Sequence, residues 1–574
     1  MINEGHDLGV VYAHLQVIWP KLGVPSKPFT GDDSDYIIES PELDFRKFED
    51  VDELLSFLNL SFDTEIPRSR LGVDHVLRFF VDGGYKFGDI CAHMRYTWPR
   101  TPKLEWEWLK AWELEMTLDV WEDFVTLDRR GKEREDQRQK SLHDDAIHDL
   151  DHIKPRRIWD LYAYRIIPFQ FSSVNANAGH SARSYLHFGL TRLGRYHPVS
   201  HSWTEDMSPI DSPVNAYEWP IPLPGGVTLE AVRNELLNLG AQYVWLDVVC
   251  LRQESSDPKR EAIRMQEWKI DVPTIGKVYK SSPSVDNVIR YLNGLGKAFR
   301  RSGWKDKRHW SQRAWTVQEV SNKYIEAGLP EGVEDLLAET DETGTQLRDH
   351  LKINEIRLDS REPRIQNVIT AMKGRHSQNP MDKIFGLSTL LECTVLPTYS
   401  KDEHPEQAWD RLLKHVSSRI LAELLFTCPL PGENGCYWRP SWRQLMEDTV
   451  VFENVRPISI LVGQVEDGHL RCSIALIKGC RVTFDCPSMS TVVLKAENEG
   501  KEYQWTMNKP HTQAIALGEY TLAGYARNSR WVLCKSHPCG ELEKVFVFHP
   551  PSLHASPLSD LSNHAFVDDA NLFW

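Results

Sequence analysis

The most informative part of this sequence is Ala241-Gln-Tyr-Val-Trp-Leu-Asp-Val-Val-Cys250, a run that is nearly all apolar and rich in β-favouring residues. Such a run is typical of a strand that is buried on both faces of a parallel sheet. A helix is predicted just before it, because Thr228 can cap a segment whose apolar residues keep helical spacing. Gly240 is placed to end that helix. A helix followed by a buried strand indicates an α/β unit.

The same alternation continues around this run. A short strand is predicted within residues 195–203, a helix over 260–279, a second short strand over 285–291 and a further helix over about 311–325. Strands that alternate with helices favour an α/β domain built on a parallel sheet.

Changes in composition divide the 574 residues into four regions. They are a mostly helical N-terminal region with a charged linker at 1–150, the α/β domain at 155–330, a helical region at 331–450 and a β-rich region at 451–574. A long helix is predicted over 104–121, where apolar and acidic residues mix without a breaker. A β-hairpin is predicted over 470–484, with Lys478-Gly479 as its turn.

The overall charge and the cysteine pattern limit the classes of function. The chain carries 67 basic and 82 acidic residues, a net charge of −15, which argues against bulk binding to nucleic acid or to anionic membranes. No run approaches 18 apolar residues, and the N-terminus lacks the pattern of a secretory signal. The ten cysteines form no C-x-x-C pair. We therefore expect a cytoplasmic protein without a disulfide framework or a structural zinc site.

Two phosphate-binding or nucleophilic motifs begin in the sequence but are not completed. Gly189-Leu-Thr-Arg-Leu-Gly194 has the first spacing of a P-loop, but Arg195-Tyr196 stands where lysine and serine or threonine are required. Gly179-His-Ser-Ala-Arg183 begins like a nucleophile elbow and lacks its final glycine. Neither segment is expected to act in these ways.

Three further residues have both a functional and a structural interpretation. His197 and His201 would face the same side of a strand and could hold a metal with carboxylates, although a polar pair near a strand end is favoured. Cys250 follows the buried strand without an activating base nearby in sequence, so a structural thiol is favoured over a nucleophile.

A tryptophan–carboxylate pair is the candidate site that the residues themselves indicate. On a helix at 100° per residue, one side collects a core stripe formed by Trp310, Ala314, Val317 and Tyr324. Trp315 and Glu319 lie four residues apart on the opposite side. Such a pair could line a cleft or pack on another domain, and helix geometry does not choose between them.

Asp247 is the only charged residue within the apolar run from Tyr243 to Cys250. A buried charge must be paired or hydrogen-bonded, and Arg252 or a backbone amide can satisfy it. In the functional interpretation, Asp247 lies toward the carboxyl end of a parallel strand, where open α/β sheets bind their ligands.

Three blocks of this sequence are similar, in the same order, to the blocks of the fungal heterokaryon incompatibility (HET) domain. They are Tyr196-His-Pro-Val-Ser-His-Ser-Trp203, Tyr243-Val-Trp-Leu-Asp-Val-Val-Cys-Leu-Arg-Gln253 and Arg313-Ala-Trp-Thr-Val-Gln-Glu319. Residues 155–161 and 382–387 resemble segments that often precede and follow that domain. The resemblance implies a role in fungal non-self recognition, in which incompatible partners trigger growth arrest or programmed cell death.

The HET domain also resembles, distantly, the Toll/interleukin-receptor (TIR) domain. This resemblance implies a flavodoxin-like parallel sheet with helices on both faces, and NAD as a substrate. Trp315-Thr-Val-Gln-Glu319 keeps the spacing of tryptophan and glutamate in the TIR catalytic motif, with Thr316 in place of its cysteine. The resemblance therefore assigns the catalytic role to Glu319.

The chemistry that the resemblance implies is cleavage of the nicotinamide–ribose bond. Positive charge builds on the ribose during this reaction, and a carboxylate such as Glu319 stabilises it. The residues expected to bind the substrate are Trp315, Ser200, His201, Ser202, Trp203 and Asp247. Neither a metal nor a cofactor is needed for this reaction.

Two other interpretations stay open at this stage. The domain could be a non-catalytic module that binds protein partners or assembles with its own copies, with the flanking regions sensing the trigger. Self-association is also compatible with catalysis, because TIR-type catalysis commonly needs assembly. Alternatively, the chain could be degenerate, with Glu319 merely paired with an arginine.

Overall fold

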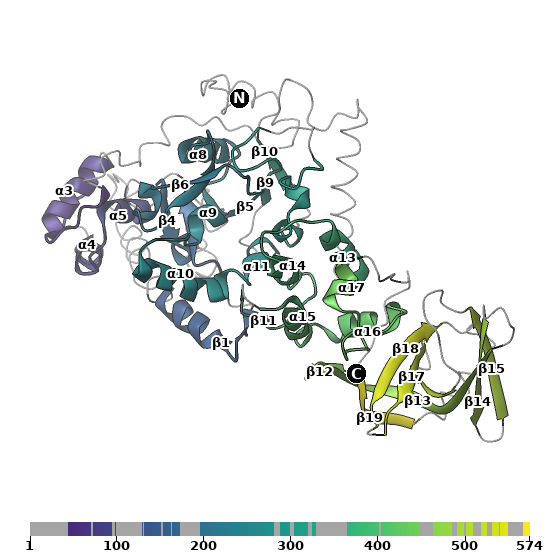
Figure 1. The fold of residues 1–574 in the computed structure, drawn as a ribbon. Coiled ribbons are helices and arrows are strands. Elements are labelled where there is room, and N and C mark those ends of the chain that lie inside the picture. The colour runs from purple at the N-terminus through teal and green to yellow at the C-terminus, as the bar shows by residue number, and fades with distance from the viewer. Residues whose placement is uncertain are drawn as a thin grey trace, which may run out of the picture. The chain divides into compact units, whose positions relative to one another are not determined.

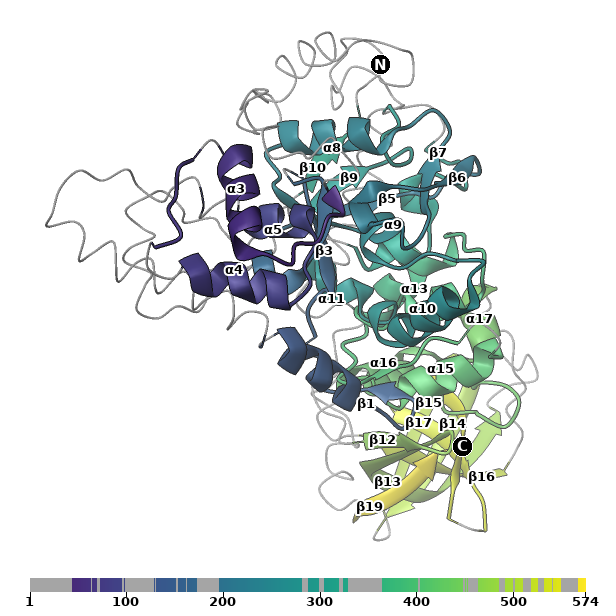
Figure 2. The same ribbon diagram turned by 90° about the vertical axis from the view of Figure 1, so that its left-hand side faces the viewer.

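Figures 1 and 2 show the computed structural model of the chain from two directions. The structure describes residues 44–62, 64–69, 73–94, 98, 129, 131–150, 153–161, 163–172, 196–280, 288–298, 304–319, 324–328, 364–400, 403–447, 450, 452, 463–484, 491–498, 501–508, 518–524, 531–538, 540–548 and 566–573. The chain divides into two compact units, residues 1–355 and 356–574. The helix predicted over 104–121 lies outside the described residues.

A six-stranded sheet forms the core of the first unit. Its strand order is β10-β9-β5-β8-β3-β4. The strands are β3 (Arg157–Asp160), β4 (Arg165–Pro168), β5 (His197–His201), β8 (Tyr243–Leu246), β9 (Val288–Tyr291) and β10 (Tyr324–Ala327). The α/β class is confirmed, but the sheet is mixed rather than wholly parallel. The hairpin of β3 and β4 extends the sheet beyond β8, with β3 antiparallel to both of its neighbours.

The four parallel strands change direction of winding at β5. Numbered along the chain, β5, β8, β9 and β10 lie across the sheet in the order 2-1-3-4. The chain therefore leaves β5 for β8 on one side and then crosses to β9 on the other. The carboxyl ends of β5 and β9 meet at this change of direction, which is the place where open α/β sheets bind ligands.

Helices cover both faces of this sheet, with α8 (Leu229–Asn238) on one side and α11 (Ile275–Lys280) on the other (Figures 1 and 2). Tyr291 donates a 2.7 Å hydrogen bond to Glu235 of α8, whereas the Tyr279 ring of α11 lies 5.8 Å from Trp245. Tyr291 is in register with His201 and Trp245 with Pro198. Residues 198 and 201 point to opposite faces of β5, because side chains alternate along a strand.

The predicted α8 is confirmed, and Thr228 caps it by accepting a hydrogen bond from the Ala231 amide at 3.1 Å. The buried run that follows forms a shorter strand than the sequence suggests. β8 ends at Leu246, and residues 247–250 form a single helical turn, α9 (Asp247–Cys250). Asp247 is therefore the first residue beyond the strand, where its own carboxylate accepts the Val248 amide at 2.7 Å.

The cap on α8 gives a direct test of this local structure. We expect Thr228→Ala to lower the free energy of unfolding by about 1 kcal/mol, because it removes the acceptor for an amide at the helix start. Thr228→Ser keeps that acceptor and should stay close to the wild type. Denaturant titration followed by circular dichroism measures both, and equal stability of the two variants would contradict the capping role.

The helix predicted over about 311–325 is wrong. The described residues of this segment form two short 3₁₀ turns, η7 (Trp310–Gln312) and η8 (Trp315–Val317), and the start of β10 at Tyr324. Arg313 between the turns has extended backbone angles. The Thr316 hydroxyl donates to the carbonyls of Trp310 and Arg313 at 2.6 and 2.9 Å. A side chain that bonds nearby carbonyls in this way competes with a regular helix.

The described part of the first unit also contains short elements around the sheet. They are α3 (Val51–Ser61), α4 (Val73–Asp82), α5 (Phe87–Met94), β1 (Leu142–His143), β2 (Ala146–Ile147), η5 (Phe169–Ser172), β6 (Met207–Ile210), η6 (Pro213–Asn215), β7 (Ile221–Pro224) and α10 (Pro258–Asp271). The described part of residues 1–150 contains the helices α3, α4 and α5. Arg165 of β4 joins them to the sheet through ion pairs with Asp44 and Asp89.

The described part of the second unit contains mainly helices, followed by strands. The helices and a short strand are α13 (Ile365–Lys373), α14 (Met381–Phe385), β11 (Leu396–Pro397), α15 (Pro405–Leu413), α16 (Ser418–Thr427) and α17 (Trp442–Met446). The strands after them are β12 (Gly463–Glu466), β13 (His469–Phe484), β14 (Thr491–Asn498), β15 (Lys501–Asn508), β16 (Gly518–Gly524), β17 (Trp531–Ser536), β18 (Leu542–Phe548) and β19 (Phe566–Phe573).

The strands β13, β16, β17, β18 and β19 form a closed ring, since β19 pairs with both β18 and β13. The hairpin predicted at Lys478-Gly479 is wrong, because β13 continues from His469 to Phe484. The register against β16 shifts between Ile477 and Cys480, and Gly479 has a φ of +73°. A glycine in this conformation allows a bulge in which the strand bends without reversing.

Candidate functional site

The first part of the site is a buried carboxylate held at the carboxyl end of β5. Ser200, the fourth residue of β5, donates a hydrogen bond from its hydroxyl to Glu319, which follows η8. The Trp310 indole N–H donates to the same hydroxyl at 2.5 Å. The Glu319 side chain is 8% exposed and that of Ser200 is fully buried. Two residues separated by 119 positions are therefore joined at the predicted edge of the sheet.

The second part of the site is a network centred on Asp247. His201, the residue after Ser200, places its Nε2 atom 2.7 Å from one carboxylate oxygen of Asp247. The indole N–H of Trp203 donates to the other oxygen at 3.1 Å. The rings of His201 and Trp203 stack with their centroids 6.3 Å apart. Consecutive residues of β5 thus hold two different carboxylates at the same end of the sheet.

His201 and Asp247 each stabilise the charged form of the other. Burial opposes the charged imidazole, but the nearby Asp247 carboxylate outweighs burial and raises the pKa of His201. Burial also opposes ionisation of Asp247, yet His201 and the hydrogen bonds from Trp203 and Val248 lower the pKa of that carboxyl. Glu319 further raises the pKa of His201, so the two carboxylates act on one imidazole.

This ion pair predicts a pH dependence of stability. The raised pKa of His201 stabilises the fold fully below 6.5, the ordinary value, and this contribution is lost as pH rises through the folded pKa. The lowered pKa of Asp247 stabilises the fold above 3.8, and this contribution is lost as pH falls through the folded value. We therefore expect the wild type to melt at a higher temperature than His201→Gln. This difference in melting temperature should be largest at about pH 5–6 and smaller toward pH 9. Lost packing adds a constant offset, so a difference independent of pH would contradict the ion pair.

The structure brings together most of the residues that the sequence indicated, but not in the expected way. Trp315 begins η8 and is half-buried. The i, i+4 helical pair of Trp315 and Glu319 is therefore replaced by a 3₁₀ turn. Ser202 is fully buried, and its carbonyl lies 3.3 Å from Nδ1 of His201. Of the two partners expected for Asp247, the backbone amide is confirmed, since the Val248 amide donates to its carboxylate, and His201 and Trp203 take the place of Arg252.

Two residues of the site were missed at the sequence level. Trp310 was assigned only to the core, although its indole N–H holds Ser200. Arg290 is 3% exposed, with its guanidinium carbon 4.7 Å from the ring centroid of Trp310 and 3.8 Å from that of Tyr324. It also donates to Glu326 at 3.1 Å. Arg290 is the single charged residue of β9. A lone charge in a buried segment is the same signal that singled out Asp247 between Tyr243 and Cys250.

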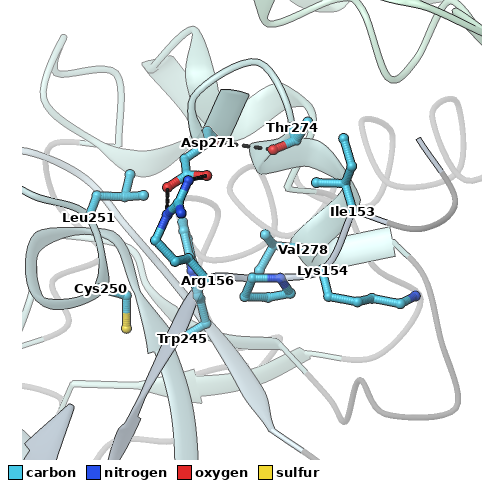
Figure 3. Close-up of a pocket in the computed structure, with 10 residues that line it drawn as sticks. Ile153, Lys154, Arg156, Trp245, Cys250, Leu251, Asp271, Thr274 and Val278 are labelled. Carbon is cyan, nitrogen blue, oxygen red and sulfur yellow. Dashed lines mark hydrogen bonds and ion pairs between the residues drawn. The ribbon is translucent and has the colours of Figure 1, made fainter. Parts of the chain in front are cut away.

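A small cavity lies elsewhere in the first unit and does not suit a nucleotide. Its volume is about 20 Å³, room for about one water molecule. Figure 3 shows the Arg156 guanidinium facing the Asp271 carboxylate at its wall, with a contact of 3.1 Å. Cys250 also lines it, and burial raises the pKa of the Cys250 thiol to about 12. Such a thiol stays protonated at neutral pH, which favours the structural interpretation of Cys250.

Within the described residues, no group of three or more histidine, cysteine or carboxylate side chains lies close enough together to hold a metal ion. The helices of the described part of the chain are all too short or too polar to cross a membrane.

No family model, curated protein or solved structure matches the chain.

Proposed function

We propose that this protein is a HET-type protein of fungal non-self recognition and programmed cell death, and that it cleaves the nicotinamide–ribose bond of NAD. The observation that carries the proposal is the contact between Ser200 and Glu319 at the carboxyl end of β5. It joins residues of the first and third blocks that resemble the HET domain, and the Asp247 network joins the first and second.

The strand order supports a nucleotide site at this place. The order 2-1-3-4 of β5, β8, β9 and β10 is that of the first four strands of a flavodoxin-like sheet, which binds its ligand between the first and third strands. Ser200 and His201 end the first of these strands and Tyr291 ends the third. We therefore propose a flavodoxin-like, TIR-like arrangement for the parallel part of the sheet.

The proposed chemistry assigns distinct roles to the two carboxylates. Glu319 stabilises the positive charge that develops on the ribose as nicotinamide leaves, and Ser200 orients the carboxylate by donating to it. The Asp247 network is charged and internally paired, so it shapes the end of β5 rather than attacking the sugar. Water completes the reaction, giving ADP-ribose, nicotinamide and a proton.

Access to Glu319 sets a condition on this activity. Only 8% of this residue is exposed, so NAD reaches the carboxylate only if the surrounding segments move. We propose that self-association of the chain causes this opening. The specific rate should then rise with protein concentration instead of staying constant.

The test is release of nicotinamide from NAD by the full chain over a wide range of protein concentrations, followed by chromatography. Equal amounts of nicotinamide and ADP-ribose, with a specific rate that increases with concentration, are the expected result. No loss of NAD at any concentration would contradict the enzyme assignment, and a constant specific rate would contradict activation by assembly.

The alternative function is a non-catalytic module that binds protein partners. The observation that favours it is the satisfied state of Glu319, which is buried and hydrogen-bonded like a structural carboxylate. In this case a variant without the Glu319 charge keeps any cell-killing activity of the protein. Loss of that activity together with NAD cleavage favours the enzyme.

A further inference from the structure

The segment Trp304–Arg308, here called the basic segment, differs in charge from the chain as a whole. The protein has a net charge of −15, whereas this segment contains three basic residues and one acidic residue. The carboxylate of Asp306 is turned to its own backbone, where it accepts the Arg308 amide at 2.8 Å. The one carboxylate of the segment is thus hydrogen-bonded within the segment itself.

Two cations of the basic segment are open to a ligand. Lys305 and Lys307 are exposed, and neither forms an ion pair with any residue in the part of the chain that the structure describes. The Lys305 ammonium lies 5.1 Å from the centroid of the Trp304 ring, which is half-buried. A cation beside a partly exposed aromatic ring suits a phosphate joined to a stacking base.

Contacts place the basic segment next to the proposed site. Arg308 pairs with Glu205, four residues after His201, at 3.1 Å. Two residues further on, the backbone amide of Trp310 donates to the Leu292 carbonyl, which directly follows β9, at 2.9 Å. The basic segment is therefore fastened to the loops that follow β5 and β9.

The two loops approach each other closely at Gly294. A Cβ atom there would lie 2.6 Å from Cγ2 of Thr204, and the glycine has a φ of +118°. Only glycine fits both the space and the conformation. The loops after β5 and β9, to which the basic segment is fastened, are therefore packed closely against each other.

We propose that the basic segment binds the diphosphate of a dinucleotide, with Lys305 and Lys307 as phosphate ligands and Trp304 as a surface for the adenine. This inference rests on the proposed function, because it takes NAD as the ligand whose ribose reaches Glu319. It adds a second contact region, one that holds the ADP-ribose half of the substrate. Flexible lysines suit a diphosphate, since each supplies a point charge.

The test measures binding of ADP-ribose, and of inorganic pyrophosphate, to the full chain by calorimetry. The double variant Lys305→Gln/Lys307→Gln should bind ADP-ribose at least about tenfold more weakly than the wild type. The matched control is Lys259→Gln/Lys269→Gln, which removes two exposed lysines of α10 and should bind like the wild type. Wild-type binding should weaken with added salt, and this dependence should be smaller in the Lys305/Lys307 variant.

The outcomes separate this inference from the enzyme assignment. Equal affinity of the wild type and the Lys305/Lys307 variant overturns the inference, as does the absence of ADP-ribose binding to the wild type. Lysine-dependent binding without any cleavage of NAD supports the inference and rejects the proposed reaction. Cleavage with the same KM in both proteins supports the reaction and rejects the basic segment as its phosphate site.

Discussion

Glu319→Gln is expected to reduce nicotinamide release by the full chain about 100-fold or more, a loss typical of removing a group that stabilises transition-state charge. Glutamine has nearly the same volume as glutamate, and its carbonyl oxygen can still accept the hydrogen bond from Ser200. The variant therefore removes the negative charge while keeping the buried contact. Initial rates at saturating NAD measure the effect.

Two controls separate catalysis from folding in this experiment. Glu230→Gln removes an exposed carboxylate on α8 and should leave the rate unchanged. The melting temperature of Glu319→Gln should stay close to that of the wild type. Equal rates in the wild type and Glu319→Gln would reject Glu319 as the catalytic residue, and Ser200→Ala should give a smaller loss because it only releases the carboxylate from its hydrogen bond.

Replacing Arg290 by methionine is expected to lower the free energy of unfolding of the first unit by about 3–5 kcal/mol, a range typical of a broken buried ion pair. The guanidinium is buried between the rings of Trp310 and Tyr324 and paired with Glu326. Its removal leaves Glu326, whose side chain is only 19% exposed, without this partner. Denaturant titration monitored by tryptophan fluorescence measures the loss.

A double variant and an exposed pair make this prediction specific. Arg290→Met/Glu326→Leu should recover a large part of the stability, because replacing both partners of a buried pair removes the uncompensated charge. Arg308→Ala, which breaks the exposed pair with Glu205, should cost less than about 1 kcal/mol. If Arg290→Met cost no more than Arg308→Ala, the buried pair would not be a main support of the sheet.

The elements that were predicted correctly are those whose signals are local. Thr228 and the apolar spacing after it depend on one helical turn, and they identified α8. The apolar run ending near Leu246 identified β8, but its end was misplaced by a few residues. That end depends on Asp247, which bonds its own neighbour's amide and His201 as soon as the strand is complete.

For the segment after Trp310, most of the buried side chains were predicted correctly, but the helical backbone conformation inferred from them was wrong. Of the predicted core stripe, Trp310, Ala314 and Val317 are buried, whereas Tyr324 is half-buried. Two 3₁₀ turns separated by an extended residue present the same side chains to the core. The helix is interrupted because the hydroxyl of Thr316 donates to two backbone carbonyls, and the spacing of apolar residues carries no information about this contact.

The contact at the centre of the site could not be derived from spacing. Ser200 and Glu319 meet because β9 crosses to the far side of β5, and the order of strands in a sheet is a non-local property. Only the resemblance to the HET domain grouped these residues beforehand. The role of Trp310 depends on the same crossing and was therefore missed.

The closed ring of the second unit has a consequence for the order of events during folding. β19 follows the other four strands of the ring in the sequence, and it pairs with both β13 and β18. Until β19 is in place, one edge of β13 has no partner within the ring, and an unpaired edge is prone to join other chains. Closure of the ring is therefore a long-range step of folding, and conditions that slow this step expose β13 to aggregation.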